Sequence, residues 1–457
     1  MNRVGVKHSC GGVNIKVCDA IMGSGKTSAA IQYMNVSPDR HYIYVAPVLE
    51  EDQRIADSCP KLNFVLPDIQ LIGTKLADLK RLLREHRNIA ITHALFEWCD
   101  DEVCKLLESG QYIMIIDEAI DIFHKSQLLA SDVDALLHNG ELLEDEEGWI
   151  TTNPEQAPKE HTAPIQNDLK YARSRSLVRV DKTSFCYWVV SPRMLKACSE
   201  IIIMTYLFRF SSMYQLLQLH HLPFRYIYIR KECEGQYCFT GRLEYLPEYM
   251  GHMHDYIRVV DMPKLNRVGD QRNALSVNWL KRECDAYNRL HRVKHTMNAR
   301  VFKEKLKQNK FYQLRSSLHS FMRYELRDIP AGDKLWTCFK RHKDQLKDHG
   351  YADNFLYCTC SSVNTYGDRH YLAYLANIIA IPEWLIFYKQ HGLEYDPNGY
   401  SLTTMLQWIW RSAIRNGEQI TLYLPSARMR NILERWMNQC EREYAEFYGD
   451  NDSKTLK

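Results

Sequence analysis

The 457-residue sequence lacks the features that would place it in a membrane, in an oxidising compartment or around a zinc ion. No apolar run reaches the roughly 18 residues of a membrane-spanning helix, and the first residues hold no long apolar segment of a signal peptide. The 14 cysteines include no Cys-x-x-Cys pair, and Cys358 and Cys360 form only a Cys-x-Cys. Structural zinc sites usually need two such pairs or spaced histidines. We therefore expect reduced thiols in a cytoplasmic protein.

The sequence also lacks a strong net charge, internal repeats and low-complexity tracts. Its formal charge of +3 is too small to indicate a nucleic-acid partner by itself. The distribution is uneven, however, because residues 281–327 hold 13 Lys/Arg against 4 Asp/Glu, while acids gather at residues 141–147. The basic segment is either an ordinary solvated face or a strip that follows a phosphate backbone.

Apolar runs of strand length alternate with helical patterns through the first 120 residues. The runs are apolar on both faces, which is typical of a parallel sheet covered by helices. The sequence therefore predicts the α/β class. The expected strands are residues 13–18, 41–46, 89–91 and 112–116, and helical patterns start within residues 27–34, 51–57 and 76–85.

The alternation stops between residues 125 and 185, where an acidic stretch precedes a Pro-, Thr- and Asn-rich segment at 151–165. We expect an insertion with a long loop here. Strand-like runs return at 186–190 and 200–204, and a second unit begins near Met213. Its expected features are strands at 226–229, 355–360 and 419–424, a helical basic region at 275–327, and a polar tail at 450–457.

Residues 20–27 (AIMGSGKT) carry the pattern of a phosphate-binding loop between a strand and a helix. Glycines let the backbone approach phosphate oxygens, a lysine reaches the β and γ phosphates, and a hydroxyl ligates magnesium. The helix N-terminus favours the anion further. A chance glycine-rich turn is the alternative, and the flanking strand and helix argue against it. The expected phosphate-binding residues are Ala20, Gly23, Ser24, Gly25, Lys26 and Thr27.

An acidic pair directly follows the apolar run at 112–116. Asp117 is positioned to hold Mg²⁺ together with Thr27, and Glu118 to orient and deprotonate an attacking water. The alternative is two acids stabilised by a helix dipole. Their place at the end of a strand, about ninety residues after the phosphate-binding loop, favours the catalytic interpretation.

A third element lies at residues 406–415 (LQWIWRSAIR). Gln407, Arg411 and Arg415 are spaced by four, so a continuous helix would carry all three on one face. An arginine from a second domain can neutralise charge in phosphoryl transfer. An ordinary surface helix with solvated arginines is the alternative.

These three elements resemble the nucleotide-site motifs of superfamily 2 helicases of the DEAD/DEAH-box-like group, in the diverged form found in bacteriophages and mobile elements. Residues 20–27 resemble motif I, residues 117–120 (DEAI) resemble motif II, and Gln407 with Arg411 resembles the start of motif VI (QxxGRxxR). Trp410 stands at the glycine of motif VI, and Arg415 lies one place beyond its last arginine. Either Arg411 or Arg415 is therefore the candidate arginine finger.

Shorter matches lie between these motifs in the expected order. Residues 46–47 with 53–54 resemble motif Ia, residues 92–93 resemble the next backbone-contacting motif, Thr205 stands at motif III, and residues 359–368 stand at motif V. The resemblance implies that one group of residues touches the nucleic-acid backbone. These are Pro47, Gln53, Arg54, Thr92 and His93.

The resemblance implies two RecA-like lobes, residues 1–212 and 213–449, that hydrolyse ATP with Mg²⁺ and move along or unwind nucleic acid, DNA in preference to RNA. It also implies protein partners in replication, recombination or defence, and the cytoplasm of a host cell. Three alternatives stay open. The protein is a nucleic-acid-stimulated switch or remodeller without unwinding, a different P-loop enzyme such as a kinase or packaging motor, or a scaffold with a degenerate site.

Overall fold

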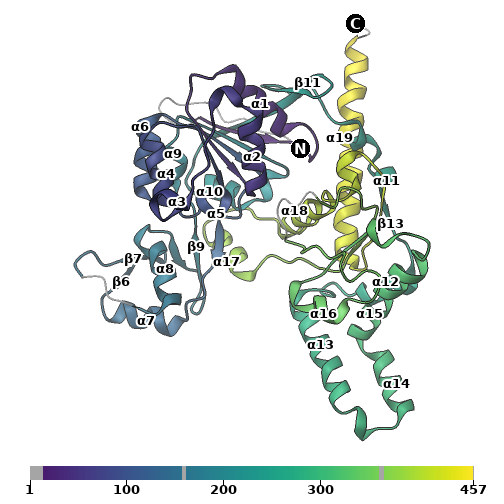
Figure 1. The fold of residues 1–457 in the computed structure, drawn as a ribbon. Coiled ribbons are helices and arrows are strands. Elements are labelled where there is room, and N and C mark those ends of the chain that lie inside the picture. Colours follow the sequence, from purple (N-terminus) through teal and green to yellow (C-terminus); the bar gives the residue numbers. More distant parts are fainter. Residues whose placement is uncertain (1–13, 157–160, 360–364, 456–457) are drawn as a thin grey trace. The chain divides into compact units, whose positions relative to one another are not determined.

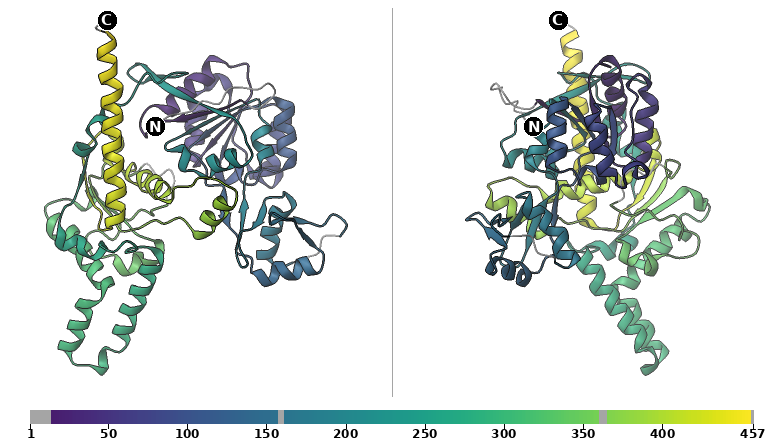
Figure 2. Two further views of the ribbon diagram at one scale, coloured as in Figure 1. Left: turned by 180° about the vertical axis from the view of Figure 1, so that it is seen from behind. Right: turned by 60° about the vertical axis from the view of Figure 1, so that its left-hand side comes forward.

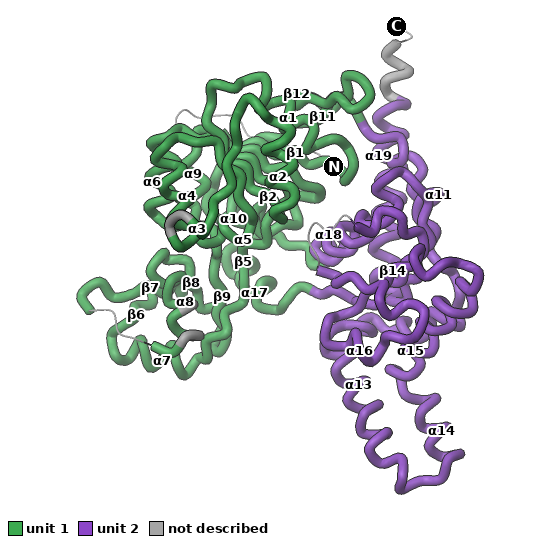
Figure 3. Tube along the Cα trace, in the orientation of Figure 1, with its two compact units in different colours: residues 1–245, 380–397 green, residues 246–379, 398–457 purple. Residues whose placement is uncertain are grey.

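The computed structural model describes residues 14–156, 161–359 and 365–455. The chain forms two compact units, one of Met1–Tyr245 with Ala380–Pro397 and one of Leu246–Ile379 with Asn398–Lys457 (Figure 3). Each unit contains a sheet with parallel strands, which confirms the expected α/β class. The boundary expected at residues 212–213 needs correction, because the chain first adds two more strands to the sheet of the first unit.

The central sheet of unit 1 has seven strands in the order β12-β11-β1-β10-β4-β2-β3. All neighbours run parallel except β11 and β12, which form an antiparallel hairpin at one edge. Strands β2 and β4 are buried along their whole length, so helices cover both faces of the sheet. The strands are β1 (Asn14–Asp19), β2 (Tyr42–Ala46), β3 (Ile89–Thr92), β4 (Ile113–Asp117), β10 (Glu200–Thr205), β11 (Phe224–Cys233) and β12 (Gln236–Thr240).

The helices of unit 1 connect these parallel strands, as right-handed crossovers require. Figure 1 shows them packed around the sheet. They are α1 (Lys26–Val36), α2 (Leu49–Ser58), α3 (Ile69–Ile72), α4 (Lys75–Arg84), α5 (His93–Phe96), α6 (Asp101–Gly110), α9 (Pro192–Lys196) and α10 (Ser212–Leu219).

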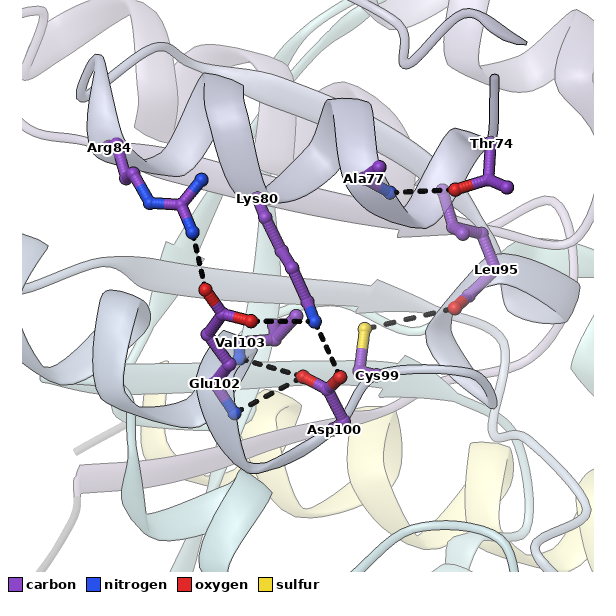
Figure 4. A network of polar contacts seen from close by, with 9 residues as sticks. All are labelled: Thr74, Ala77, Lys80, Arg84, Leu95, Cys99, Asp100, Glu102 and Val103. Carbon is purple, nitrogen blue, oxygen red and sulfur yellow. Dashed lines mark hydrogen bonds and ion pairs between the residues drawn. The ribbon is translucent and has the colours of Figure 1, made fainter. Parts of the chain in front are cut away.

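Helices α4 and α6 are joined by a polar network on their outer surface (Figure 4). Thr74 caps α4 and Asp100 caps α6, each by accepting backbone N–H bonds from the first turn. The Nζ of Lys80 lies 2.6 Å from Asp100 and 2.8 Å from Glu102, and Arg84 also pairs with Glu102. Exposed pairs of this kind contribute little singly, so the network chiefly fixes how the two helices lie together.

The insertion expected between residues 125 and 185 is a folded subdomain rather than one long loop. Its antiparallel sheet has the order β5-β9-β8-β7-β6 around its own apolar core. The run at 186–190, expected in the main sheet, lies instead in β9 of this subdomain. The elements are β5 (Phe123–Lys125), α7 (Ala130–His138), β6 (Leu142–Glu144), β7 (Trp149–Thr152), α8 (Ala163–Arg173), β8 (Leu177–Arg179) and β9 (Phe185–Trp188).

A helix from far along the chain packs on this insertion. In α17 (Pro382–Gln390), the ring of Phe387 lies 4.7 Å from the ring of Phe123. The Nε2 of Gln390 donates to the carbonyl of Val180 at 3.2 Å. Phe387 is fully buried, which stabilises the contact by roughly 1.5–3 kcal/mol. The chain therefore leaves unit 2 to complete unit 1 and then returns.

Unit 2 has a four-stranded parallel sheet in the order β13-β16-β15-β14. The strand expected at 419–424 is β16, whereas the described part of the run at 355–360 forms only an isolated bridge from Phe355 to Trp336. The basic region expected to be helical is α13 to α15. The elements are α11 (Met253–Tyr256), β13 (Ile257–Val259), α12 (Pro263–Asn266), α13 (Val277–Arg292), α14 (Ala299–Gln308), α15 (Lys310–Ser320), β14 (Lys334–Thr337), α16 (Lys343–Leu346), β15 (Tyr371–Tyr374), α18 (Pro397–Ile409), β16 (Ile420–Tyr423) and α19 (Ala427–Thr455).

Among the described helices, none is long and apolar enough to cross a membrane. The longest, α19, carries charged side chains throughout its length and packs against the α11 region of unit 2.

His370 joins the amino ends of three strands of the unit 2 sheet. It directly precedes β15, and its Nδ1 lies 2.7 Å from Asp333, which precedes β14. Its Nε2 lies 2.6 Å from Glu418, which precedes β16. The two ring nitrogens can donate at the same time only when the ring is protonated to imidazolium. Partial burial by itself lowers the pKa of His370, but the two carboxylate hydrogen bonds outweigh it and raise the pKa above its ordinary value.

We expect His370→Gln to lower the stability of the protein at pH 6 and to change it little at pH 9. A pKa raised in the folded state contributes stability that is complete below the unfolded pKa of about 6.5 and is lost as the pH rises through the folded value. The measurement is the midpoint of thermal unfolding at both pH values, read as the difference between variant and wild type. An equal loss at both pH values would show that the imidazolium charge does not contribute.

Candidate functional site

Five neighbouring parallel strands of the unit 1 sheet have their carboxyl ends at the same edge. In sheet order they are β1, β10, β4, β2 and β3. In the strand register, Asp19 lies opposite Thr205, and Asp117 lies opposite Met204. Thr92 ends β3 at the same edge. Ligands of open α/β sheets bind at the carboxyl ends of the strands. The segments singled out along the first half of the sequence therefore converge on one place.

The loop after β1 depends on two glycines with left-handed backbone. Gly23 has φ +78° and Gly25 has φ +92°, and Gly25 is the residue before α1 begins. A Cβ on Gly25 would also lie 2.5 Å from the ring of Tyr237 in β12. Backbone conformation and lack of space thus both require glycine there.

Lys26, the first residue of α1, reaches back across this loop. Its Nζ donates to the carbonyls of Ala20 at 2.6 Å and Ile21 at 3.0 Å. Burial lowers the pKa of Lys26, and the nearby carboxylates of Asp117 and Glu118 oppose that shift. The Nζ of Lys26 therefore lies beside the helix N-terminus, where the free amides of the first turn favour an anion.

Ser24 supplies an independent sign that the loop accommodates a ligand. Its side chain is 2% exposed, and its Oγ has no hydrogen-bond partner among the described residues. Buried polar atoms are usually satisfied. An unsatisfied hydroxyl inside a glycine-rich loop fits a phosphate oxygen as its partner.

Asp117, the last residue of β4, is 8% exposed and held by two hydroxyl groups. The Tyr44 hydroxyl donates to its Oδ2 at 2.7 Å, and the Thr27 hydroxyl lies 3.3 Å from the same oxygen. Burial raises the pKa of Asp117, while the hydrogen bond from Tyr44 favours the carboxylate. A carboxylate beside a hydroxyl is the hard oxygen donor set that Mg²⁺ prefers, so Thr27 and Asp117 fit the metal role expected of them.

Glu118 follows in an uncommon backbone conformation. Its φ is +64°, and its backbone N–H donates to the carbonyl of Met204 at 2.9 Å. Left-handed backbone in a residue other than glycine is rare and gathers at functional sites.

Asp19 clamps the segment that follows β10. Its Oδ1 accepts from the backbone N–H of Leu207 at 2.7 Å, and its Oδ2 from that of Phe208 at 3.2 Å. Alongside, the backbone N–H of Ala20 donates to the carbonyl of Thr205 at 2.9 Å. The phosphate-binding loop and the position expected for motif III are thereby tied together.

The residues expected at motif Ia lie on and before α2. Pro47 follows β2, and Gln53 and Arg54 are exposed on the helix. The amide of Gln53 donates to Asp57, and Arg54 pairs with Glu51 at 3.0 Å. These two side chains therefore lie at the surface and pair with acids of their own helix.

Thr92 and His93, expected to touch nucleic acid, both make contacts inside the fold. The Thr92 hydroxyl caps α5 by accepting from Leu95. The Nε2 of His93 lies 2.8 Å from the backbone carbonyl of Asp117, so this nitrogen carries the proton. Burial lowers the pKa of His93 to about 4, which keeps the ring neutral. The structure thus gives His93 a positioning contact with motif II.

The expectation that Gln407, Arg411 and Arg415 share one helical face is wrong. Helix α18 ends at Ile409, where the Ser412 hydroxyl and backbone N–H both bond the Ile409 carbonyl and close a tight turn. Gln407 lies in α18, the buried Arg411 in the turn, and the exposed Arg415 in a short 3-10 helix. All three belong to unit 2.

Half of the expected motif V, residues 360–364 of 359–368, lies outside the described residues. Three side chains of the site were missed in the sequence. Asp19 stands directly before the loop and could have been noticed there, and Tyr44 alternates with Tyr42 along a strand. Tyr237 has no local signal, since only the folding of β12 against α1 brings it to Gly25.

Comparison with known proteins agrees with this architecture. The family model of the YonV C-terminal Rossmann-like domain matches residues 251–437. The SPbeta prophage-derived uncharacterized protein YonV of Bacillus subtilis (strain 168) is 29% identical over 431 residues, which cover 93% of this chain and 98% of that protein.

Two solved structures similar to this chain are an Xpd4 protein and an XPD helicase. Xpd4 of S. tokodaii is 10% identical, with a TM-score of 0.42, and the match covers 93% of this chain and 94% of that one. An XPD helicase is 12% identical, with a TM-score of 0.39, and the match covers 92% and 94%.

We expect Tyr44→Phe to lower the free energy of unfolding by about 1.5–3 kcal/mol, the usual worth of a hydrogen bond to a charged group. The change removes only the hydroxyl that donates to the buried Asp117 carboxylate. Urea denaturation at pH 7.5 measures it. Tyr42→Phe is the matched control, because the Tyr42 hydroxyl donates to a neutral carbonyl, that of Ser37. Equal losses in the two variants would contradict a special role for the charge of Asp117.

Proposed function

We propose that this protein is an ATP hydrolase of the helicase type, which moves along or unwinds nucleic acid, DNA in preference to RNA. The observation that carries the proposal is the convergence of Lys26, Thr27, Asp117 and Glu118 at the carboxyl edge of one parallel sheet. Binding of a nucleotide needs the first two of these residues, whereas hydrolysis needs all four.

The phosphate-binding loop would hold the triphosphate through backbone and side chain together. The left-handed Gly23 and Gly25 bring the loop close to phosphate oxygens, and the Ser24 hydroxyl gains the partner that it lacks within the described fold. Lys26 exchanges its carbonyl contacts for the β and γ phosphates. The exchange is favourable because a buried ammonium bonds an anion more strongly than a neutral carbonyl.

Thr27 and Asp117 would hold Mg²⁺, which neutralises charge on the phosphates. Glu118 is the proposed general base, since it directly follows the proposed metal-binding carboxylate and has the uncommon left-handed backbone that gathers at functional sites. A positioned carboxylate that takes a proton from the attacking water contributes about 10²–10⁴-fold to the rate.

Two contacts support a coupling between hydrolysis and nucleic acid. Tyr44 lies three residues before Pro47 and donates to the carboxylate of Asp117. His93, in the other segment expected near the nucleic-acid backbone, bonds the carbonyl of the same residue. A shift of Asp117 during hydrolysis is thus transmitted to the segments after β2 and β3. Contacts of these segments with the phosphate backbone would provide motion without sequence preference.

The experiment that tests the proposal compares Lys26→Ala with Glu118→Gln. We expect Lys26→Ala to abolish hydrolysis because the phosphates lose their cation. Glu118→Gln should still bind ATP but hydrolyse it slower by a factor on the order of 100 or more. The measurements are ATP binding and ATPase rate without polymer and with single-stranded DNA, duplex DNA or RNA, followed by strand displacement on the best activator.

The pattern of activation separates the competing functions. Activation by nucleic acid without strand displacement would replace the motor with a switch or remodeller. Hydrolysis that ignores every polymer would indicate a different P-loop enzyme. Wild-type turnover in Lys26→Ala would overturn the nucleotide site itself.

A separate prediction concerns the arginines of unit 2. Motif spacing makes Arg411 the candidate finger, and we expect Arg411→Lys to lower the ATPase rate at least 10-fold with little change in nucleotide affinity, because lysine keeps the charge but not the planar fork. Arg415→Lys, at an exposed position, is the matched control. A rate loss confined to Arg415→Lys would move the finger there.

A further inference from the structure

Helices α13 and α14 form a hairpin that projects from the rest of unit 2. The views in Figures 1 and 2 agree that its far end extends away from the four-stranded sheet. Only the first half of α13 is anchored in the core, through the buried side chains of Trp279, Leu280 and Cys284. Helix α14 has no buried residue. We call residues 277–308 the basic hairpin.

Rings and a cap hold the basic hairpin together. The ring of His291 lies 4.4 Å from that of Tyr287 on α13 and 5.3 Å from that of Phe302 on α14. Asn298 caps α14 by accepting from the N–H of Val301. The aromatic rings of the two helices therefore pack against each other. These contacts and the cap hold α13 and α14 together as a folded hairpin.

The outward faces of the hairpin are strongly basic. Residues 289–307 contain seven Lys/Arg and one acid, Glu304. Glu304 pairs with Arg300 at 3.3 Å, and Lys294 lies over the ring of Phe302. Five exposed basic side chains have no ion-pair partner among the described residues. They are Arg289, Arg292, Lys303, Lys305 and Lys307.

This arrangement argues against an ordinary solvated face. Exposed helices usually mix both signs and pair them at spacings of three or four residues. Here Lys303 and Lys307 are one turn apart, about 6 Å along the axis, with like charge. Such a pair destabilises the helix, so the surplus of positive charge lowers the free energy of unfolding. A polyanion with closely spaced charges removes that repulsion.

We propose that the basic hairpin binds the phosphate backbone of nucleic acid, as a contact additional to the edge of the unit 1 sheet. Each strand of duplex DNA offers one charge per roughly 3.4 Å of axis, enough to meet several of these side chains at once. No side-chain set for reading bases accompanies them, so binding is independent of sequence. This inference rests on the proposed function in that both concern nucleic acid, but binding by the hairpin requires no bound ATP.

A membrane surface fits the hairpin less well. Helices that lie on membranes need a wide apolar face opposite the basic one. In α14 the apolar side chains Val301, Phe302 and Leu306 are all half-buried rather than exposed. Two large apolar side chains of the described hairpin are substantially exposed, Val277 at its base (54%) and Val293 at its turn (43%), and they stand at opposite ends of α13 rather than forming one face. The basic surplus, moreover, continues from the turn along α14 through Lys303, Lys305 and Lys307 instead of gathering at the turn alone.

The test is a five-fold change of the unpaired charges to glutamine, which keeps helix propensity. The variant is R289Q/R292Q/K303Q/K305Q/K307Q. Binding of the full-length protein to duplex and single-stranded DNA is measured without nucleotide over a series of salt concentrations. We expect affinity to fall at least about 10-fold near 0.15 M salt. For duplex, the slope of log K against log salt should become shallower by roughly 3–4.5, as three to five lost phosphate contacts predict.

A matched control removes five exposed basic side chains of unit 1 and leaves the hairpin intact. It is R40Q/K61Q/R87Q/K105Q/K182Q. Both variants change net charge equally, so a long-range effect of charge alone would affect them alike. Far-UV circular dichroism checks the fold, and ATPase activity without polymer should equal that of wild type in both.

The outcomes decide between this inference and the proposed function. DNA binding by the hairpin variant with the affinity and salt slope of the control would overturn the inference. Loss of binding to anionic vesicles with unchanged DNA binding would overturn it in favour of a membrane. Hairpin-dependent DNA binding in a protein that hydrolyses no ATP would support the inference and reject the proposed function. Wild-type protein that binds no DNA would reject both.

Discussion

The buried carboxylate of Asp117 is the constraint on which the first unit depends. A charge at the end of a fully buried strand is costly unless donors surround it. Here the donors come from different segments, the hydroxyl of Tyr44 on β2 and that of Thr27 on α1. His93 adds a bond to the backbone carbonyl of the same residue. Satisfying one carboxylate therefore fixes how three segments meet at the sheet edge.

The same edge explains why two acids with different roles can stand next to each other. Asp117 is buried and directed to hydroxyl groups, whereas the chain turns sharply at Glu118 through left-handed backbone. On the other side of β10, Asp19 accepts two backbone N–H groups of the segment after Thr205. Two carboxylates at this edge therefore have different contacts, because Asp19 accepts from backbone N–H groups and Asp117 from hydroxyl groups.

The sequence predicted what is local and missed what is assembled over long distances. The strand, glycine loop and helix at residues 14–36 follow from contiguous apolar runs and glycines, and the structure has them within a residue or two. The insertion sheet was missed because three of its five strands have only three residues and resemble loops. The domain boundary was misplaced because the sequence of β11 is that of an ordinary strand. It does not indicate whether the strand begins a new sheet or, as in the structure, pairs with β1.

The helical spacing in the sequence also predicted a longer helix than α18, which ends at Ile409. The spacing of Gln407, Arg411 and Arg415 continues the helical repeat past Ile409, and no proline or glycine interrupts it before Gly417. The helix ends because Ser412 bonds the Ile409 carbonyl and the buried Trp408 bonds the carbonyl of Leu356. Tertiary packing thus overrides a repeat that the sequence alone favours.

Net charge was a poor guide to function for a physical reason. Opposite charges cancel in a total, but fields in water are screened within about 8 Å at physiological salt, so a ligand responds to the local surplus. Some acids of the insertion are paired locally, as Glu144 is with Arg179 and Glu141 with His161. The basic side chains at the far end of the hairpin have few acids near them. A chain with little net charge can therefore carry one strongly basic hairpin, and the positive charge of that hairpin attracts anionic ligands.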